Sequence, residues 1–125
     1  GCGDLIPDDN VVFPADMGEV VAVTGVSWPG GGVPCGIHRG GDVEVTAWLE
    51  VPTTGRLTSE VTSIGGSSNA TAVVAGIAAL VWQANPTLTR DQVRARLQQA
   101  GAFWPARNGT QGFGLVNAHR AVTGQ

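Results

Sequence analysis

The 125-residue sequence has no long apolar run and no block of charges of one sign. None of its apolar stretches approaches the roughly 20 residues that a membrane-spanning helix needs. Its 7 basic and 10 acidic side chains give a formal net charge of −3 and are spread along the chain. This distribution argues against a nucleic-acid-binding surface and against a basic patch for membranes. A chain of this length can bury one core, so we expect residues 1–125 to form one domain or part of one.

Cysteine is scarce as well. The two cysteines, Cys2 and Cys35, are too few for a disulfide scaffold and lack the spacing of a metal site. They either pair with each other in an oxidising compartment or are two ordinary buried thiols, and the sequence alone leaves both interpretations open.

Glycine and proline, by contrast, are frequent, and they lie between apolar segments. Residues 20–26 form a β-branched run that is apolar on both faces, which predicts a strand buried inside a parallel sheet. Residues 27–41 hold six glycines and two prolines and predict a loop. The alternation over residues 43–48 predicts a second strand.

The second half of the chain has helical patterns. Residues 70–83 are small and apolar almost all round, which predicts a helix enclosed by protein. Asn85 and Pro86 should end it, and residues 89–92 offer a capping box for a second helix with Val93 and Leu97 on one face. A last short helix is expected over residues 118–122. Strands that alternate with helices favour an α/β fold with an open parallel sheet.

The segment Gly65-Gly66-Ser67-Ser68 leads directly into the long apolar helix. A serine at a helix N-terminus is well placed to act as a nucleophile, because free N–H groups and the helix dipole stabilise the negative oxygen that develops on an attacked carbonyl. Small neighbours such as Gly66 and Ser67 let a substrate backbone come close. The same residues also fit a plain turn with a serine N-cap, which contributes about 1 kcal/mol to a helix.

Residues 66–76, G-S-S-N-A-T-A-V-V-A-G, resemble the subtilase signature G-T-S-x-A-x-P-x-V-A-G, in which the serine is the nucleophile. Ser68 occupies that place. Residues 85–97 and 112–118 are similar to the blocks that follow the signature in this family, and residues 13–23 and 41–47 to two blocks that precede it. The resemblance implies a serine endopeptidase that forms an acyl-enzyme on Ser68. It also implies the C-terminal portion of a three-layer subtilisin-like fold, with a mostly parallel sheet flanked by helices.

The family's other two catalytic residues precede the nucleophile, in the motifs D-[ST]-G and H-G-T-x-V-A-G, and neither motif occurs here. We expect His38 to be an ordinary loop residue and His119 an ordinary helix residue. The resemblance therefore implies an N-terminal half, as a preceding segment or a second chain, that completes the sheet and the triad.

Departures from the family pattern support a competing hypothesis. Ala72 replaces the proline of the signature, Trp48 stands where a proline usually follows the strand, and Asp4 takes the oxyanion-hole position where an asparagine is usual. A catalytically inactive pseudoprotease, acting as a binding or regulatory module, is therefore the alternative to an enzyme. A weaker third hypothesis is an interaction module that forms a compact monomer by itself.

The resemblance also implies binding sites. It places Val12 near the floor of the specificity pocket, where a branched side chain favours small or medium P1 residues, with Gly66 and Ser67 also beside the substrate. No cofactor is required, but calcium is common in the family, and Asp42 and Glu44 form a candidate cation site unless both are merely solvated. The expected partner besides the N-terminal half is a peptide or protein substrate, with no nucleic acid and no membrane. The expected location is secreted or extracytoplasmic.

Overall fold

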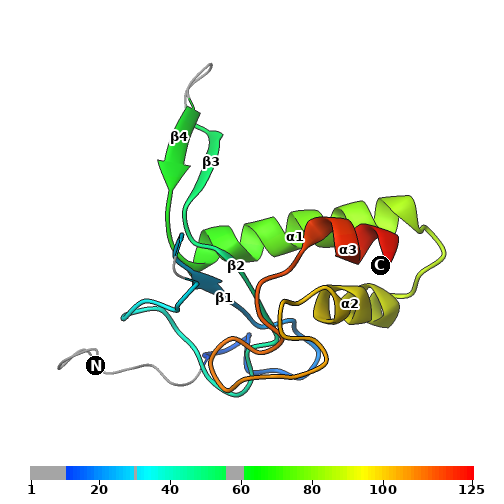
Figure 1. The fold of residues 1–125 in the computed structure, drawn as a ribbon, viewed down its shortest axis with the longest axis horizontal. Helices are drawn as coiled ribbons and strands as arrows, with labels where there is room; N and C mark the ends of the chain where they lie inside the picture. The colour runs from blue at the N-terminus through cyan, green and yellow to red at the C-terminus, as the bar shows by residue number, and fades with distance from the viewer. Residues whose placement is uncertain (1–10, 30, 56–60) are drawn as a thin grey trace.

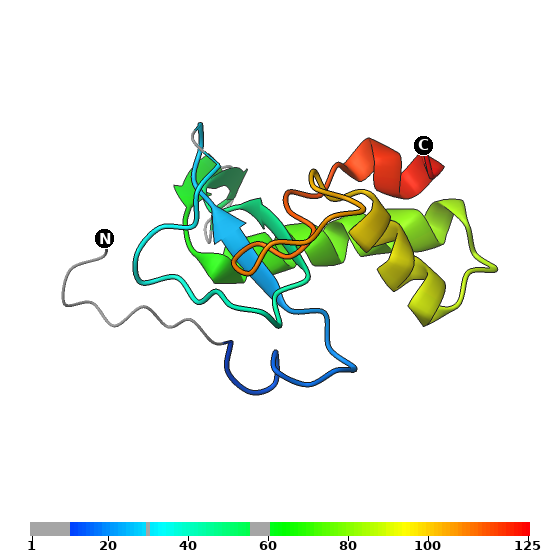
Figure 2. The same cartoon turned by 60° about the horizontal axis from the view of Figure 1, so that its bottom comes forward.

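A computed structural model describes residues 11–29, 31–55 and 61–125 of the chain. Within these ranges, four strands precede three helices along the sequence. They are β1 (Val23–Val26), β2 (Val45–Trp48), β3 (Val51–Thr54), β4 (Val61–Ile64), α1 (Ser67–Ala84), α2 (Arg90–Gln99) and α3 (Ala118–Thr123). The longest element is α1; α2 and α3 lie beside its C-terminal half, and β1 crosses its N-terminal half (Figure 1, Figure 2).

The sheet next to α1 is parallel, as expected. Strands β1 and β2 pair from Val23 opposite Val45 to Val26 opposite Trp48. On the other side of β2, Leu115 forms a parallel bridge with Thr46. Both strands are shorter than the sequence predicted, since β1 begins at residue 23 rather than 20 and β2 at residue 45 rather than 43.

A second, antiparallel pair was not predicted from the sequence. Strands β3 and β4 pair from Val51 opposite Ile64 to Thr54 opposite Val61. This hairpin stands at the N-terminal end of α1 and connects the end of β2 to the start of that helix (Figure 1).

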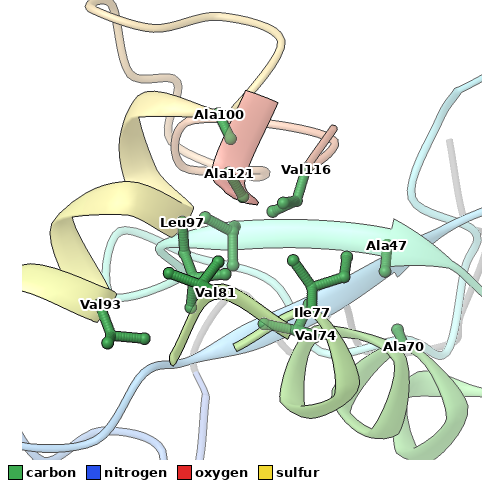
Figure 3. Close-up of a cluster of buried hydrophobic side chains, with 11 residues drawn as sticks. Ala47, Ala70, Val74, Ile77, Val81, Val93, Leu97, Ala100, Val116 and Ala121 are labelled. Carbon is green, nitrogen blue, oxygen red and sulfur yellow. The ribbon is translucent and has the colours of Figure 1, made fainter. Parts of the chain in front are cut away.

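The core lies where one face of α1 meets the parallel sheet and the two shorter helices. The buried positions of α1 after its first turn recur at intervals of three and four residues, which is the spacing of a single helix face. They pack with residues of β2, α2 and α3 and of the segment before α3 in one cluster (Figure 3), which contains Val45, Ala47, Ala70, Val74, Ile77, Val81, Val93, Leu97, Ala100, Val116 and Ala121.

The opposite face of α1 is exposed, so the described residues alone enclose only one face of the helix. Between residues 72 and 80 the exposed residues on this face are small or apolar, and the largest of them, Leu80, is 51% exposed. The reason is that the sheet and the two shorter helices all pack on the other side. We call this exposed row the α1 stripe; it consists of Ala72, Ala75, Gly76, Ala79 and Leu80.

The predicted helix ends are confirmed with small shifts. Helix α1 begins at Ser67, three residues earlier than expected, and is capped at its C-terminus by Asn85. Thr89 and Gln92 form the predicted capping box, with hydrogen bonds of 2.8 and 3.2 Å. Across the part of the chain that the structure describes, we find no helix with both the length and the apolar character needed to span a membrane.

Candidate active site

The first turn of α1 carries the predicted nucleophile. Ser67 and Ser68 are the first two residues of the helix, and Gly66 is its N-cap, with φ 115° and ψ 167°. Only glycine adopts this backbone conformation without strain. No side chain makes a capping hydrogen bond at the N-terminus of this helix. The interpretation of this segment as a serine N-cap is therefore wrong, because both serines lie inside the helix.

The backbone around Ser68 leaves two hydrogen-bond donors free. The amides of Asn69 and Ala70 donate to the carbonyl of Gly66 at 3.1 and 3.3 Å. The amides of Ser67 and Ser68 have no hydrogen-bond partner among the residues described. They lie at the positive end of an 18-residue helix, where a negatively charged oxygen is stabilised. The Ser68 side chain is exposed and accessible to a substrate.

The next residue ties this turn to the sheet. Asn69 is 8% exposed, and its Nδ2 donates to the carbonyl of Leu49 at 3.2 Å. The amide of Leu49 in turn donates to the carbonyl of Val26 at 3.0 Å. Ser68 therefore stands beside the carboxyl ends of β1 and β2, the edge at which open α/β sheets bind their ligands.

Neither histidine forms a catalytic pair with Ser68, whose hydroxyl has no hydrogen bond to any described residue. His119 lies in α3, in a groove that it shares with Leu80 and Val122. Leu80 follows Ser68 by twelve residues, about 18 Å along the helix axis. His38 is half-buried in the loop before β2, and its carbonyl accepts a hydrogen bond from the hydroxyl of Thr24.

Of the other predicted site residues, some lie next to Ser68 and others do not. Gly66 and Ser67 adjoin it. Val12 belongs to a turn well before β1 and is 59% exposed. Asp4 and Cys2 lie outside the described residues. Cys35 is disulfide-bonded.

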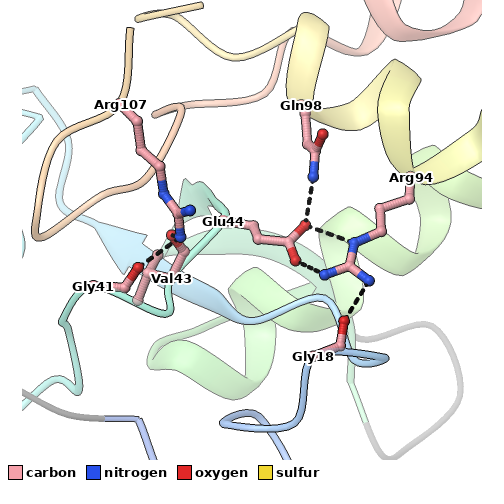
Figure 4. Close-up of polar contacts among 7 residues, drawn as sticks. All are labelled: Gly18, Gly41, Val43, Glu44, Arg94, Gln98 and Arg107. Carbon is pink, nitrogen blue, oxygen red and sulfur yellow. Dashed lines mark hydrogen bonds and ion pairs between the residues drawn. The ribbon is translucent and has the colours of Figure 1, made fainter. Parts of the chain in front are cut away.

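Glu44 is held by the second helix (Figure 4). Glu44 is only 6% exposed. Its carboxylate accepts two hydrogen bonds from Arg94, one from Nε at 3.0 Å and one from Nη2. It accepts a third from Nε2 of Gln98 at 3.0 Å. Arg94 also donates to the carbonyl of Gly18 at 2.7 Å. Hydrogen bonding to Glu44 raises the pKa of Arg94, so this side chain is positively charged at every ordinary pH.

These contacts bear on the candidate cation site at Asp42 and Glu44. A cavity of about 200 Å³ does lie between them and Asp16. However, its walls include Arg94 and Arg107, and Arg107 donates to the carbonyls of Gly41 and Val43 at 2.6 and 2.9 Å. Two guanidinium groups bind oxygens that a cation would need and repel it by charge. Nowhere in the described ranges do three His, Cys, Asp or Glu side chains converge as for a metal. The cation site stays a prediction, and this geometry weighs against Glu44 as a ligand.

Parallel strands packed against helices, with an exposed serine opening the longest helix, put the chain in the class of α/β domains with a subtilisin-like fold. Residues 8–114 match the sequence profile of the Subtilase family, and the chain belongs to that family.

Three curated relatives are proteases. The "Thermostable alkaline protease" of Halalkalibacterium halodurans is 34% identical over 113 residues, which are 90% of this chain and 30% of that protein. "Serine protease AprX" of Bacillus subtilis is 41% identical over 71 residues, 56% of this chain and 16% of the relative. "Halolysin-like extracellular serine protease Nep" of Natrialba magadii is 38% identical over 61 residues, 49% of this chain and 11% of the relative. The chain thus spans less than a third of the length of each of these relatives.

Solved structures agree on the fold. A protease from Pseudoalteromonas arctica superposes with a TM-score of 0.72 at 28% identity, covering 90% of this chain and 38% of that one. MycP1 from Mycobacterium smegmatis superposes with a TM-score of 0.76 at 23% identity, covering 90% of this chain and 32% of that one. At 23% identity, the similarity to MycP1 shows the fold alone.

Proposed function

We propose that the chain is the C-terminal portion of the catalytic domain of a serine endopeptidase, with Ser68 as its nucleophile. The observation that carries this proposal is the first turn of α1, where an exposed serine hydroxyl stands beside two backbone amides that bond to no described residue. An acyl-transfer site needs both a nucleophile and donors for the oxyanion within one small space.

In the proposed reaction, a histidine outside this chain removes the proton from Ser68 Oγ, and Oγ attacks the carbonyl carbon of a peptide bond. The carbonyl oxygen becomes negative and faces the Ser68 amide and the Asp4 region. The intermediate collapses, the histidine gives its proton to the leaving amine, and the acyl-enzyme on Ser68 is hydrolysed by water. An ionised Asp4 would repel the oxyanion, and it lacks the side-chain amide of the asparagine that is usual at this position. Loss of one oxyanion-hole donor typically lowers turnover by about 10²- to 10³-fold.

The proposed partner is the N-terminal half of the same protease domain, as a preceding segment or a second chain. Two surfaces support this. The edge of β1 away from β2 pairs with no described residue, although Thr24 and Val26 are buried. The α1 stripe is apolar, and no described residue covers it. An unpaired strand edge and an apolar helix face both require a cover in a stable protein.

We further propose that the protein acts outside the cytoplasm on peptide or protein substrates. The disulfide at Cys35 fits an oxidising compartment, and one relative carries the word extracellular in its name. Val12 at the specificity pocket would favour small or medium P1 side chains.

Hydrolysis of casein by the natively purified protein, with every co-purifying chain retained, tests this function. Ser68→Ala should lower hydrolysis by at least about a thousandfold. Thr71→Ala is the matched control, since it removes the next exposed hydroxyl of α1, one turn away, and should hydrolyse casein like the native protein. Undiminished hydrolysis by the Ser68 variant would refute the assignment. No hydrolysis by a native sample that contains the N-terminal half would favour the pseudoprotease.

A further inference from the structure

Asn69 is an unusual residue for its position in α1. Of the buried residues in this helix, four are alanine, valine or isoleucine, and Asn69 is the polar one. Asparagine is a poorer helix former than alanine, and burial of its amide is costly unless the amide is hydrogen-bonded. The hydrogen bond from Nδ2 to the carbonyl of Leu49 satisfies this requirement with a residue twenty positions earlier in the chain.

Leu49 is itself a fixed point of the sheet. It is buried, and its amide donates to Val26 of β1. Its side chain packs against the backbone of Gly25, so closely that a Cβ atom on Gly25 would overlap it. A side chain bound to the Leu49 carbonyl is therefore anchored to both parallel strands.

The first turn of α1 needs such an anchor. Helix ends fray, and most are held by a side chain that accepts hydrogen bonds from the first amides. Gly66 provides no such side chain. A capping oxygen would also occupy the very amides that an oxyanion must reach. Asn69 instead donates outward to the sheet, which holds the turn and, among the described residues, leaves the amides of Ser67 and Ser68 without a partner.

We infer that Asn69 is a positioning residue for Ser68. Its hydrogen bond to Leu49 fixes the orientation and position of the first helical turn relative to the sheet. It thereby also fixes the direction in which Ser68 Oγ points. This inference rests on the proposed role of Ser68 as nucleophile. Because Asn69 is buried and its amide is bound to the Leu49 carbonyl, its loss should slow the covalent step without weakening binding, since that step depends steeply on the alignment of the reacting atoms.

The test uses a fluorophosphonate probe at a series of concentrations on the natively purified protein with all co-purifying chains. The series gives a maximal labelling rate and a half-saturating concentration. Asn69→Ala should lower the maximal rate about tenfold, the effect of one lost hydrogen bond, and leave the half-saturating concentration unchanged. Leucine is similar in size to asparagine and a better helix former. Asn69→Leu should therefore slow labelling as much as Asn69→Ala does, while changing the melting temperature less than Asn69→Ala does.

Two controls separate positioning from stability. Thr71→Ala removes a side-chain hydrogen bond in the same region that stays within the helix, from Oγ1 to the Ser67 carbonyl at 2.9 Å, and should label at the native rate. Val93→Ala removes buried volume in α2 and should lower the melting temperature without slowing the labelling of folded protein.

The inference is overturned if both Asn69 variants label at the native rate, or if Val93→Ala slows labelling as much as they do. A native protein that contains the N-terminal half but is not labelled at Ser68 overturns the proposed function, and this inference with it. Native labelling with unaffected Asn69 variants overturns the inference alone.

Discussion

Single polar residues join the elements of this chain at points that the apolar core does not reach. Glu44 precedes β2, and Arg94 and Gln98 lie in α2, so their hydrogen bonds bind the start of a strand to a helix fifty residues later. A carboxylate this buried is tolerated only because charged and polar donors surround it.

Replacement of Arg94 by alanine should therefore lower the free energy of unfolding by about 2–3 kcal/mol, somewhat below the range for fully buried pairs because Arg94 is partly exposed. Arg90→Ala is the control, since its contact with Asp91 at 3.5 Å joins two well-exposed side chains and is worth less than about 1 kcal/mol. Chemical denaturation of both variants measures the difference. Equal free energies of unfolding for the two variants would show that the Arg94–Glu44 pair contributes nothing to stability.

The pH dependence of this contribution follows from the raised pKa of Arg94. A base whose pKa is higher in the folded state contributes its full stabilisation below its unfolded pKa and loses it only above its folded pKa. The difference in the free energy of unfolding between the native protein and Arg94→Ala should therefore stay constant from pH 6 to pH 9.

At this scale the sequence predicted a serine at the start of the apolar helix and missed the residues that surround it. Ser68 was singled out as a candidate nucleophile because the motif around it is local. Glu44 was interpreted as a cation ligand because a sequence shows a charge without showing its partner, and Arg94 lies fifty positions away. The sequence does show that Asn69 is a polar residue in an apolar helix. It does not show the hydrogen-bond acceptor of Asn69, because that acceptor is a backbone carbonyl and every residue has one.

Among the elements, α1 is distinguished by the way it begins. Gly66 takes a backbone conformation with φ 115° that turns the chain from β4 into the helix without a side-chain cap. This turn determines which way the first amides point.

Gly66→Ala should cost about 1–3 kcal/mol of stability, because an L-residue is strained at this φ. The effect is conformational rather than steric, since no atom lies within 4 Å of the added Cβ. Gly109→Ala, also without neighbours within 4 Å and without a positive φ, is the control and should leave stability nearly unchanged. Denaturation measures both, and a Gly66 variant as stable as the control would contradict the strained turn.

The elements also show which predictions a sequence supports. The start of α2 was predicted because its capping box is made by residues three positions apart. The β3–β4 hairpin was missed because Pro52 interrupts the pattern of β3 and the pairing joins residues up to thirteen positions apart. The burial of α1 was predicted on both faces because its composition is uniform, whereas the described chain covers one face.

At the scale of the whole molecule, the chain has the fold class that its sequence predicted, and it spans 30% of the relative that it matches over the greatest length. The α1 stripe and the outer edge of β1 are the surfaces on which the proposed N-terminal half would pack. The sequence could not place the triad's histidine and aspartate, because their motifs do not occur in these residues.

Ala75→Glu puts a charge in the middle of the α1 stripe and should disrupt its cover. If the N-terminal half is a separate chain, it should no longer co-purify; if it precedes residue 1, the melting temperature should fall by several degrees. Ala106→Glu, in the exposed loop between α2 and α3, is the control. Residues 1–125 alone should expose the stripe and associate. A stable monomer in a sizing experiment would favour the interaction-module hypothesis.

The proposed role of Ser68 is that of the nucleophile in an assembled serine protease. The most direct measurement is to label the natively purified protein with a fluorophosphonate probe, all co-purifying chains retained, and to locate the adduct by mass spectrometry. We predict an adduct on Ser68 that is lost when the sample is denatured before labelling, because only an assembled triad activates the serine. A sample that contains the N-terminal half and gives no adduct on Ser68 would contradict the protease function and leave an inactive member of the subtilase family.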